Sequence, residues 1–336
     1  MEASIAISGE NRAGEVRRAI RELAAGHGMS EADTGRALLV GTELSTNLAK
    51  YGQRGSVTVS WFDDGEGATR SEGIQLLAVD HGPGLENYER SARDGHSTGG
   101  SLGLGLGVLQ RNADTLEVHS VAGKGAAFLA RINPARPTGA PLARRLLTGS
   151  REMPKPGQDI SGDAWTSIQR DKWHRLCIVD GLGHGPLAAT ASAAAIRLIE
   201  RSTPQDSPAS LLTQAHKELK GTRGAVMGIV DLDLANGVLS FAGVGNTLGL
   251  LVTGGQSQHL MPMEGIVGYN MRAPRQHQYP CLPSSVLILA TDGISSRLQL
   301  DMELMGKHPA LIAGVLFRDH ARDTDDATIV AARCWP

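Results

Sequence analysis

The sequence predicts an α+β protein made of two layered sandwich domains. The chain has 336 residues, which exceeds the size of one ordinary domain. Strand and helix patterns occur in both halves without a steady alternation between them. Between the halves lies Asn133-Pro-Ala-Arg-Pro-Thr-Gly-Ala-Pro141, where three prolines and a glycine interrupt helices and sheets alike. We therefore predict a first domain over residues 1–135, a linker over 136–142 and a second domain over 143–336.

Composition excludes several functional classes. The hydrophobic fraction is 41% and the formal net charge is −2, so the chain can form cores and has no general signal for binding nucleic acid or a membrane. No apolar run reaches the roughly twenty residues of a membrane span, and the amino terminus lacks a secretory signal pattern. The widely spaced Cys177, Cys281 and Cys334 predict free thiols, and with them a cytoplasmic location.

Hydrophobic periodicity predicts the elements of the first domain. Helices are expected over 14–25, 30–50 and 104–113, and strands over 57–62, 74–79, 116–121 and 126–132. Ser30, with Glu31 and Asp33 behind it, is the expected cap of the second helix. Asp80 directly follows the second strand. These elements predict an α+β layered domain that ends near residue 133.

The second domain is predicted to be a sandwich of antiparallel sheets with helices. Strands are expected over about 159–168, 173–179, 225–232, 237–243, 247–252, 286–290 and 327–333. Helices are expected over about 186–200, 208–220 and 309–320, with Pro186 suited to the first turn of its helix. The stretch from 143 to 157 belongs either to the linker or to the start of this domain.

Three motifs of the first domain predict a nucleotide site. Glu43 and Asn47 are four residues apart, so both project from one face of a helix, where they could hold a water or hydroxyl together with Mg²⁺. Asp80 could accept a hydrogen bond from an exocyclic amine. Glycines allow tight backbone turns and leave backbone N–H groups accessible to phosphates. The glycines and neighbouring leucines expected at this site are Gly82, Gly84, Gly99, Gly100, Leu102, Gly103, Leu104 and Gly105.

In this order and spacing, the three motifs resemble those of the Bergerat-fold (GHKL) ATPases, most closely the anti-sigma-factor serine kinases. The resemblance implies ATP binding with Mg²⁺, with Glu43 as the general base, Asn47 as the magnesium ligand and Asp80 as the residue that recognises adenine. The family's members phosphorylate a serine or threonine of a small STAS-domain protein. Ala126 departs from the pattern, because a threonine is usual at that position.

Four aspartates of the second domain predict a metal site. Asp163, Asp180, Asp292 and Asp325 each lie at or beside a predicted strand end, and Gly181 and Gly293 follow two of them. Strands that converge can bring these carboxylates together, and oxygen ligands suit Mg²⁺ or Mn²⁺. Two bound ions could lower the pKa of a shared water so that it attacks phosphorus without a protein nucleophile. A glycine beside an aspartate leaves its carbonyl accessible as a further ligand.

The four contexts Ser-Gly-Asp163, Asp180-Gly-Leu-Gly-His-Gly, Thr-Asp292-Gly and Asp325-Asp-Ala-Thr resemble the metal-dependent PPM phosphatases of the SpoIIE type. The resemblance implies an αββα sandwich, two Mn²⁺ or Mg²⁺ ions and hydrolysis of phosphoserine or phosphothreonine on STAS-domain proteins. It implies that Asp180 bridges the ions, that Gly181 lends its carbonyl, and that Asp163, Asp292 and Asp325 complete the ligand set. Asp326 is an alternative to Asp325.

His184 lies in the second of these contexts. Its side chain belongs either near the phosphate or in packing at the start of the following helix. The absence of insertions makes the second domain most similar to the stressosome-associated members of its family.

Together the two resemblances imply a bacterial partner-switching regulator. The second domain would dephosphorylate a STAS-domain phosphoprotein, and the first would bind ATP and phosphorylate a related protein. A sigma factor or an anti-sigma kinase is a further candidate partner, whereas nucleic acid and membrane are not expected. Two alternatives stay open: a first domain that only senses ATP or docks, and a chain that binds a sigma factor or STAS protein without catalysis. Four gathered carboxylates argue against the second alternative, because a binding protein has no need of them.

Overall fold

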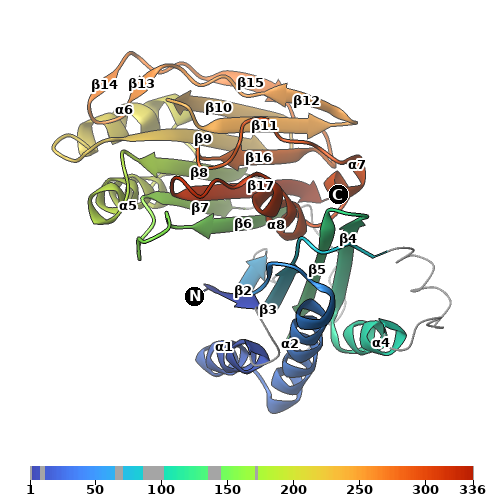
Figure 1. Ribbon diagram of the computed structural model, residues 1–336. Helices are drawn as coiled ribbons and strands as arrows, with labels where there is room; N and C mark the ends of the chain where they lie inside the picture. Colours follow the sequence, from blue (N-terminus) through green and yellow to red (C-terminus); the bar gives the residue numbers. More distant parts are fainter. Residues whose placement is uncertain are drawn as a thin grey trace. The chain divides into compact units, whose positions relative to one another are not determined.

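The computed structural model describes residues 2–7, 12–64, 71–85, 102–134, 145–170 and 173–335 (Figure 1). The chain divides into two compact units, Met1–Pro141 and Leu142–Pro336. The predicted linker from 136 to 142 lies outside the described residues. Within the described part of the chain, no helix is both long and apolar enough to cross a membrane.

The first unit is an antiparallel five-stranded sheet with three described helices. The strand order is β1-β2-β3-β5-β4. The strands are β1 (Glu2–Ile7), β2 (Gly55–Asp64), β3 (Ser71–Val79), β4 (Thr115–Val121) and β5 (Gly125–Ile132). The helices are α1 (Ala13–Gly26), α2 (Glu31–Tyr51) and α4 (Leu102–Asn112). The edge strand β1 was not predicted, and α4 begins two residues earlier than expected.

Helix α2 forms the centre of this unit because its sequence supplies both a cap and an apolar face. The Ser30 hydroxyl accepts a hydrogen bond from Asp33 N at 3.1 Å, which confirms the predicted cap. Val40, Leu44 and Leu48 recur at helical spacing and are buried in the core between helices and sheet. Glu43 and Asn47 are each one position before one of these leucines, so α2 holds them beside the core at partly buried positions.

The second unit is an αββα sandwich, as predicted. One sheet has the order β15-β10-β9-β8-β7 and the other β12-β11-β16-β17-β6. In the first sheet the strands are β7 (Asp163–Arg170), β8 (Trp173–Gly181), β9 (Ala225–Asp233), β10 (Val238–Val244) and β15 (His277–Pro280). In the second they are β6 (Arg145–Met153), β11 (Leu248–Thr253), β12 (Gln256–His259), β16 (Val286–Ala290) and β17 (Ala327–Trp335).

Helices cover the outer faces of both sheets. Helices α5 (Pro186–Glu200) and α6 (Pro208–Glu218) pack on strands of the first sheet, and α8 (Pro309–His320) packs on β6 and β17 (Figure 1). A short helix, α7 (Met302–Met305), precedes α8, and β13 (Gly265–Ile266) forms a small hairpin with β14 (Asn270–Met271).

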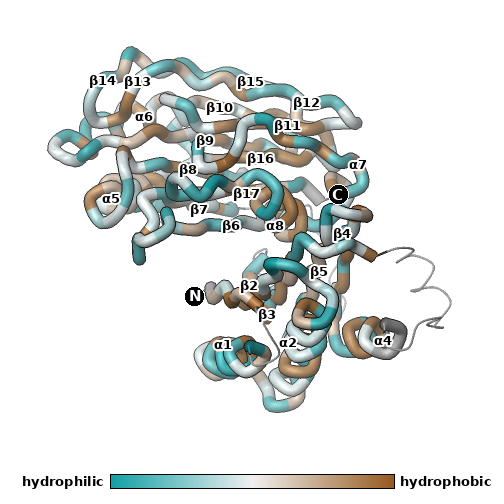
Figure 2. Tube along the Cα trace, in the orientation of Figure 1, coloured by the Kyte–Doolittle hydropathy of each residue, from teal (hydrophilic) through white to brown (hydrophobic). Residues whose placement is uncertain are grey.

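Alternation along the strands builds two cores in this unit. In β8, Leu176 and Ile178 belong to the core between the sheets, whereas Cys177 and Val179 belong to the core under α5 and α6. Both faces of β8 are therefore apolar, and Figure 2 shows the hydrophobic colouring along the central strands of the sandwich. This burial on two sides fixes the position at which β8 ends, and thus the position of Asp180.

Two predicted boundaries change. The stretch from 143 to 157 contains β6, which pairs with β17 in the second unit, so it does not belong to the linker. The strand expected from residue 159 begins only at Asp163, because Gly162 N donates instead to the Asp326 carboxylate at 2.8 Å. The strands β12 to β15 were not predicted, because they are only two to four residues long and show no apolar alternation.

Candidate functional site

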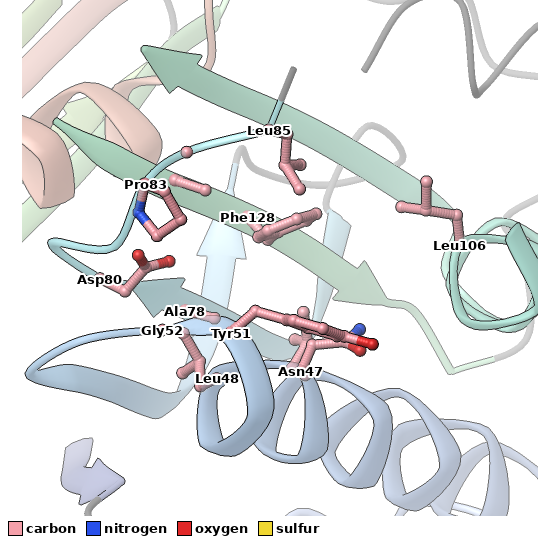
Figure 3. Close-up of a pocket in the computed structure, with 13 residues that line it drawn as sticks. Asn47, Leu48, Tyr51, Gly52, Ala78, Asp80, Pro83, Leu85, Leu106 and Phe128 are labelled. Atoms are coloured by element: carbon pink, nitrogen blue, oxygen red, sulfur yellow. The ribbon is translucent and has the colours of Figure 1, made fainter. Parts of the chain in front are cut away.

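A pocket in the first unit lies between α2, the loop after β3, and β5 (Figure 3). It encloses about 540 Å³ of space, including the part open to solvent. The lining residues are Leu44, Asn47, Leu48, Tyr51, Gly52, Ala78, Asp80, Pro83, Gly84, Leu85, Leu106, Ala126 and Phe128. Most are apolar, and Asn47 and Asp80 bring side-chain polar atoms to the pocket, as expected for a small-molecule site.

Asp80 is held rigidly at one end of this pocket. Its backbone N donates to Ala126 O at 3.0 Å, which ties the end of β3 to β5. Its buried carboxylate accepts a hydrogen bond from Gly82 N at 2.5 Å. The structure thus brings the predicted Asp80, Gly82 and Gly84 together in one tight turn. Ala126, the departure from the family pattern, lines the pocket beside them.

Gly105 allows α4 to approach the polar face of α2. A Cβ atom at Gly105 would collide with the Glu43 carboxylate and would lie 3.5 Å from Asn47 Nδ2. The structure therefore brings Glu43, Asn47 and Gly105 together, although these residues are about sixty positions apart in the chain. Any side chain at position 105 would displace Glu43.

The rest of the predicted glycine-rich segment is only partly described. Leu102, Gly103 and Leu104 form the first turn of α4, where backbone N–H groups have no intrahelical partners and the helix dipole favours an anion. Gly99 and Gly100 lie outside the described residues. The described turn has the polarity required for a phosphate site beside Glu43 and Asn47.

In the second unit, the structure gathers the predicted aspartates around Asp180. Asp163 opens β7 and lies directly opposite Asp180 on β8. Burial raises the pKa of Asp180 to about 8, and the carboxylates of Asp163, Asp292, Asp325 and Asp326 add to that increase. The predicted acidic residues therefore share one electrostatic environment at the ends of several strands.

Of the four aspartates Asp163, Asp180, Asp292 and Asp325, Asp163 is the most buried. Burial raises its pKa to about 7, against the effect of hydrogen bonds from threonine. Thr291 Oγ1 donates to Asp163 Oδ2 at 2.7 Å, and Thr328 N donates to Thr291 Oγ1 at 2.9 Å. Thr291 therefore links the ends of three strands, a role that the sequence analysis missed although it had singled out Thr-Asp-Gly.

The structure distinguishes Asp325 from Asp326. The two carboxylate oxygens of buried Asp326 accept hydrogen bonds from Lys155 N at 2.7 Å and Gly162 N at 2.8 Å. Asp326 thereby holds the loop before Asp163 against β17. Asp325 is less buried, and its carboxylate accepts a hydrogen bond from Asp326 N at 3.0 Å. Asp325 is therefore the more accessible of the two for a metal ion.

Asn246 is a further site residue that the sequence analysis missed. It follows β10, and its Nδ2 donates to Asp292 Oδ2 at 2.9 Å. Asp292 itself is exposed after β16. The signal in the sequence was Gly245-Asn246 directly after an apolar strand. Asp180 and Asp292 also stand beside a glycine at the end of an apolar strand. Asn246 orients one oxygen of Asp292 without adding charge.

In the loop after Asp180, Gly181 is buried and His184 is exposed. Gly181 N donates to Gly162 O at 3.1 Å, which joins the two loops that carry Asp180 and Asp163. His184 is exposed, so its side chain does not pack at the start of α5. The structure therefore does not show the packing role that was one of the two alternatives for His184; the other, a position near the phosphate, stays a prediction.

The donor set fits a hydrated hard cation. Among the described residues, no three acidic, histidine or cysteine side chains lie close enough together to hold a metal ion by themselves. Mg²⁺ nevertheless needs few protein ligands, because it keeps several of its waters. Burial raises the pKa of Asp180, and the neighbouring carboxylates of Asp163, Asp292, Asp325 and Asp326 raise it further, so a cation near Asp180 would be attracted by all of them.

Two family models match the chain. The Histidine kinase-like ATPase domain matches residues 8–130, and Stage II sporulation protein E (SpoIIE) matches residues 170–334. The first match includes Glu43, Asn47 and Asp80. The second includes Asp180 and Asp325 and begins after Asp163.

Relatives in Bacillus subtilis (strain 168) agree with this division. Serine/threonine-protein kinase RsbT is 31% identical over 105 residues, which are 31% of this chain and 76% of RsbT. Phosphoserine phosphatase RsbX is 28% identical over 145 residues, which are 43% of this chain and 72% of RsbX. A crystal structure of RsbX in complex with magnesium shares the fold, with a TM-score of 0.50 and 23% identity, and the match covers 58% of this chain and 98% of that one.

These matches confirm the families that the motifs predicted. The chain belongs to the histidine kinase-like ATPases through its N-terminal domain and to the SpoIIE-type PPM phosphatases through its C-terminal domain.

Proposed function

We propose that this chain is a metal-dependent phosphoserine/phosphothreonine protein phosphatase that acts on a STAS-domain protein in a bacterial partner-switching pathway. The observation that carries the proposal is the pairing of Asp163 with Asp180 at the ends of β7 and β8, with the carboxylates of Asp292 and Asp325 beside them. Such a group is costly to maintain in a fold unless a cation neutralises it. The match to the SpoIIE family and the similarity to a phosphoserine phosphatase support phosphate-ester hydrolysis as its use.

The residues of the second domain have distinct proposed roles. Asp180 would bridge two Mn²⁺ or Mg²⁺ ions, and Gly181 would lend its carbonyl. The remaining ligands would be Asp163, Asp292 and Asp325. When bound, such ions supply Lewis-acid stabilisation and a water of lowered pKa. Thr291 would keep one oxygen of Asp163 in place through its 2.7 Å hydrogen bond.

The first domain would bind ATP with Mg²⁺ and transfer a phosphoryl group to a serine or threonine of a related protein. Asp80, fixed by Gly82 and Ala126, would recognise the adenine base. Asn47 would hold Mg²⁺ and Glu43 would act as the general base, with the first turn of α4 facing the phosphates. The similarity to RsbT, a serine/threonine-protein kinase, supports kinase activity over ATP sensing alone.

Substitution of one residue in each domain tests the two activities separately. Asp180→Asn should abolish Mn²⁺-dependent release of phosphate from a phosphoserine STAS protein and leave ATP binding unchanged. Glu43→Ala should abolish transfer of radiolabel from ATP to candidate STAS proteins and leave ATP binding and phosphatase activity unchanged. Phosphatase turnover retained by Asp180→Asn would refute the metal assignment.

The radiolabel assay also separates a kinase from an ATP sensor. If wild-type protein binds ATP but transfers no label to any candidate, the first domain is a sensing or docking module. If wild-type protein neither transfers label nor hydrolyses phosphoserine, the chain is a binding protein.

A further inference from the structure

The turn between α6 and β9 lies beside the loop that carries Asp180. Asp180 and Gly181 pair with Val226 and Ala225 on β9. Beyond that pairing, Leu182 N donates to Gly224 O at 3.0 Å. Arg223 is the residue before Gly224, so the backbone places it at the same end of the sheet as Asp180.

Hydrogen bonds fix the backbone on both sides of Arg223. Thr222 Oγ1 donates to Leu219 O at 2.7 Å and accepts from Gly224 N at 3.0 Å. On the other side, Ala225 exchanges backbone hydrogen bonds with Val267, which follows β13. The turn is therefore a fixed base for the Arg223 side chain.

The Arg223 guanidinium lies over Gly183. A Cβ atom at Gly183 would be only 2.8 Å from Arg223 Nη1, and Gly183 has a φ of +86°, which favours glycine. The Arg223 side chain is exposed, and within the described residues its guanidinium forms no hydrogen bond or ion pair. A cation without an acidic partner thus lies two residues along the loop from Gly181.

This placement suits a phosphate ligand. Arginine binds phosphate through two parallel N–H donors, and such charge-assisted hydrogen bonds are stronger than neutral ones. The carboxylates around Asp180 repel a phosphate dianion, so the substrate needs positive groups near this end of the sheet in addition to metal ions. The alternative is a solvated arginine that only packs on Gly183.

We propose that Arg223 binds the phosphate group of the phosphoserine substrate beside the carboxylates at the end of β8. This inference rests on the proposed phosphatase function, and it adds a substrate-binding residue outside the metal ligands.

The test compares Arg223→Gln with Arg197→Gln in the full Mn²⁺-loaded chain. Arg197 is an exposed arginine of α5 and serves as the matched control. Arg223→Gln should raise KM for a phosphoserine peptide by about 10- to 100-fold, with a smaller change in kcat. It should weaken binding of inorganic phosphate, measured by calorimetry, by a similar factor. Arg223→Lys should be intermediate, because it keeps the charge without the paired donors.

Three results would overturn the inference. One is an unchanged KM and phosphate affinity in Arg223→Gln. Another is an equal loss in Arg197→Gln. The third is a parallel loss of Mn²⁺ affinity and thermal stability in Arg223→Gln, which would assign Arg223 a structural role. Phosphate calorimetry does not depend on turnover, so it decides the role of Arg223 even if wild-type protein fails to hydrolyse the peptide.

Discussion

Asp163 and Asp180 face each other across β7 and β8, at paired positions of the ladder. Like charges directly opposite one another destabilise a sheet, and burial adds to that effect. Burial raises the pKa of Asp163 to about 7 and the pKa of Asp180 to about 8, and the carboxylate of Asp163 adds to the increase at Asp180. The strand ends therefore form a negative group that protons or a metal ion can neutralise.

Metal-free protein should lose stability as the pH rises from about 4 to about 8. The pKa values of Asp163 and Asp180 are raised above the value of 3.8 expected in an unfolded chain, so the folded state binds more protons in this window. The free energy of unfolding then decreases with rising pH and levels off above about 8. The melting temperatures of EDTA-treated wild-type protein and of the double variant Asp163→Asn/Asp180→Asn, compared over this pH range, measure the loss of stability. A wild-type-minus-variant difference that does not change with pH would contradict it.

Divalent cations should stabilise the protein more at pH 8 than at pH 6. Protons occupy Asp163 and Asp180 at the lower pH, and a metal ion must displace them. The increase in melting temperature on addition of Mn²⁺, measured at both pH values at one metal concentration, checks this. An increase that is larger at pH 6 would exclude these carboxylates as ligands.

Substitution of Asp325 and of Asp326 should have different consequences. Asp326→Ala removes the acceptor for Lys155 N and Gly162 N in a buried place, so we expect a loss of about 3 kcal/mol in the free energy of unfolding. In the absence of metal, the free energy of unfolding of Asp325→Ala should stay within about 1 kcal/mol of the wild-type value. Its affinity for Mn²⁺ should nevertheless be lost. Urea unfolding and Mn²⁺ titration separate the two effects, and the opposite pattern would make Asp326 the ligand.

Asn246→Ala should weaken Mn²⁺ binding by about tenfold, because residues that orient a metal ligand contribute at this level. The lost interaction is the 2.9 Å hydrogen bond from Asn246 Nδ2 to Asp292 Oδ2. Asn236→Ala is the control, because Asn236 Nδ2 donates to Asp233 Oδ2 at 2.7 Å in a turn between β9 and β10. Isothermal titration with Mn²⁺ compares them, and equal affinities for both variants would refute this role for Asn246.

Gly105→Ala should reduce the affinity for Mg-ATP by more than about tenfold, because the added Cβ collides with the Glu43 carboxylate and would push the first turn of α4 away from Asn47. Gly107→Ala is the control in the same helix. A Cβ at Gly107 would meet only the flexible end of Arg111, at 2.9 Å from Nη1, and alanine favours the helix. Nucleotide titration should show near wild-type affinity for Gly107→Ala. Equal affinities for both variants would place the nucleotide away from Glu43 and Gly105.

Much of the architecture can be predicted from local sequence patterns. The spacing of Glu43 and Asn47 places them on one face of α2, and Ser30 caps that helix as expected. Apolar strands followed by Asp-Gly predict where Asp180 and Asp292 lie. These predictions succeed because they depend on helix and strand periodicity, which is a property of neighbouring residues.

Contacts between distant residues required the tertiary structure. The hydrogen bonds of Thr291 with Asp163 and of Asn246 with Asp292 join residues 128 and 46 positions apart. Arg223 meets Gly183 only because β8 and β9 pair in one register, and Asp326 is distinguished from Asp325 by the loop that it holds. Local sequence sets which chemical groups lie at the strand ends. Sheet register and loop packing decided which of them touch, because no local pattern encodes the pairing of strands far apart in the chain.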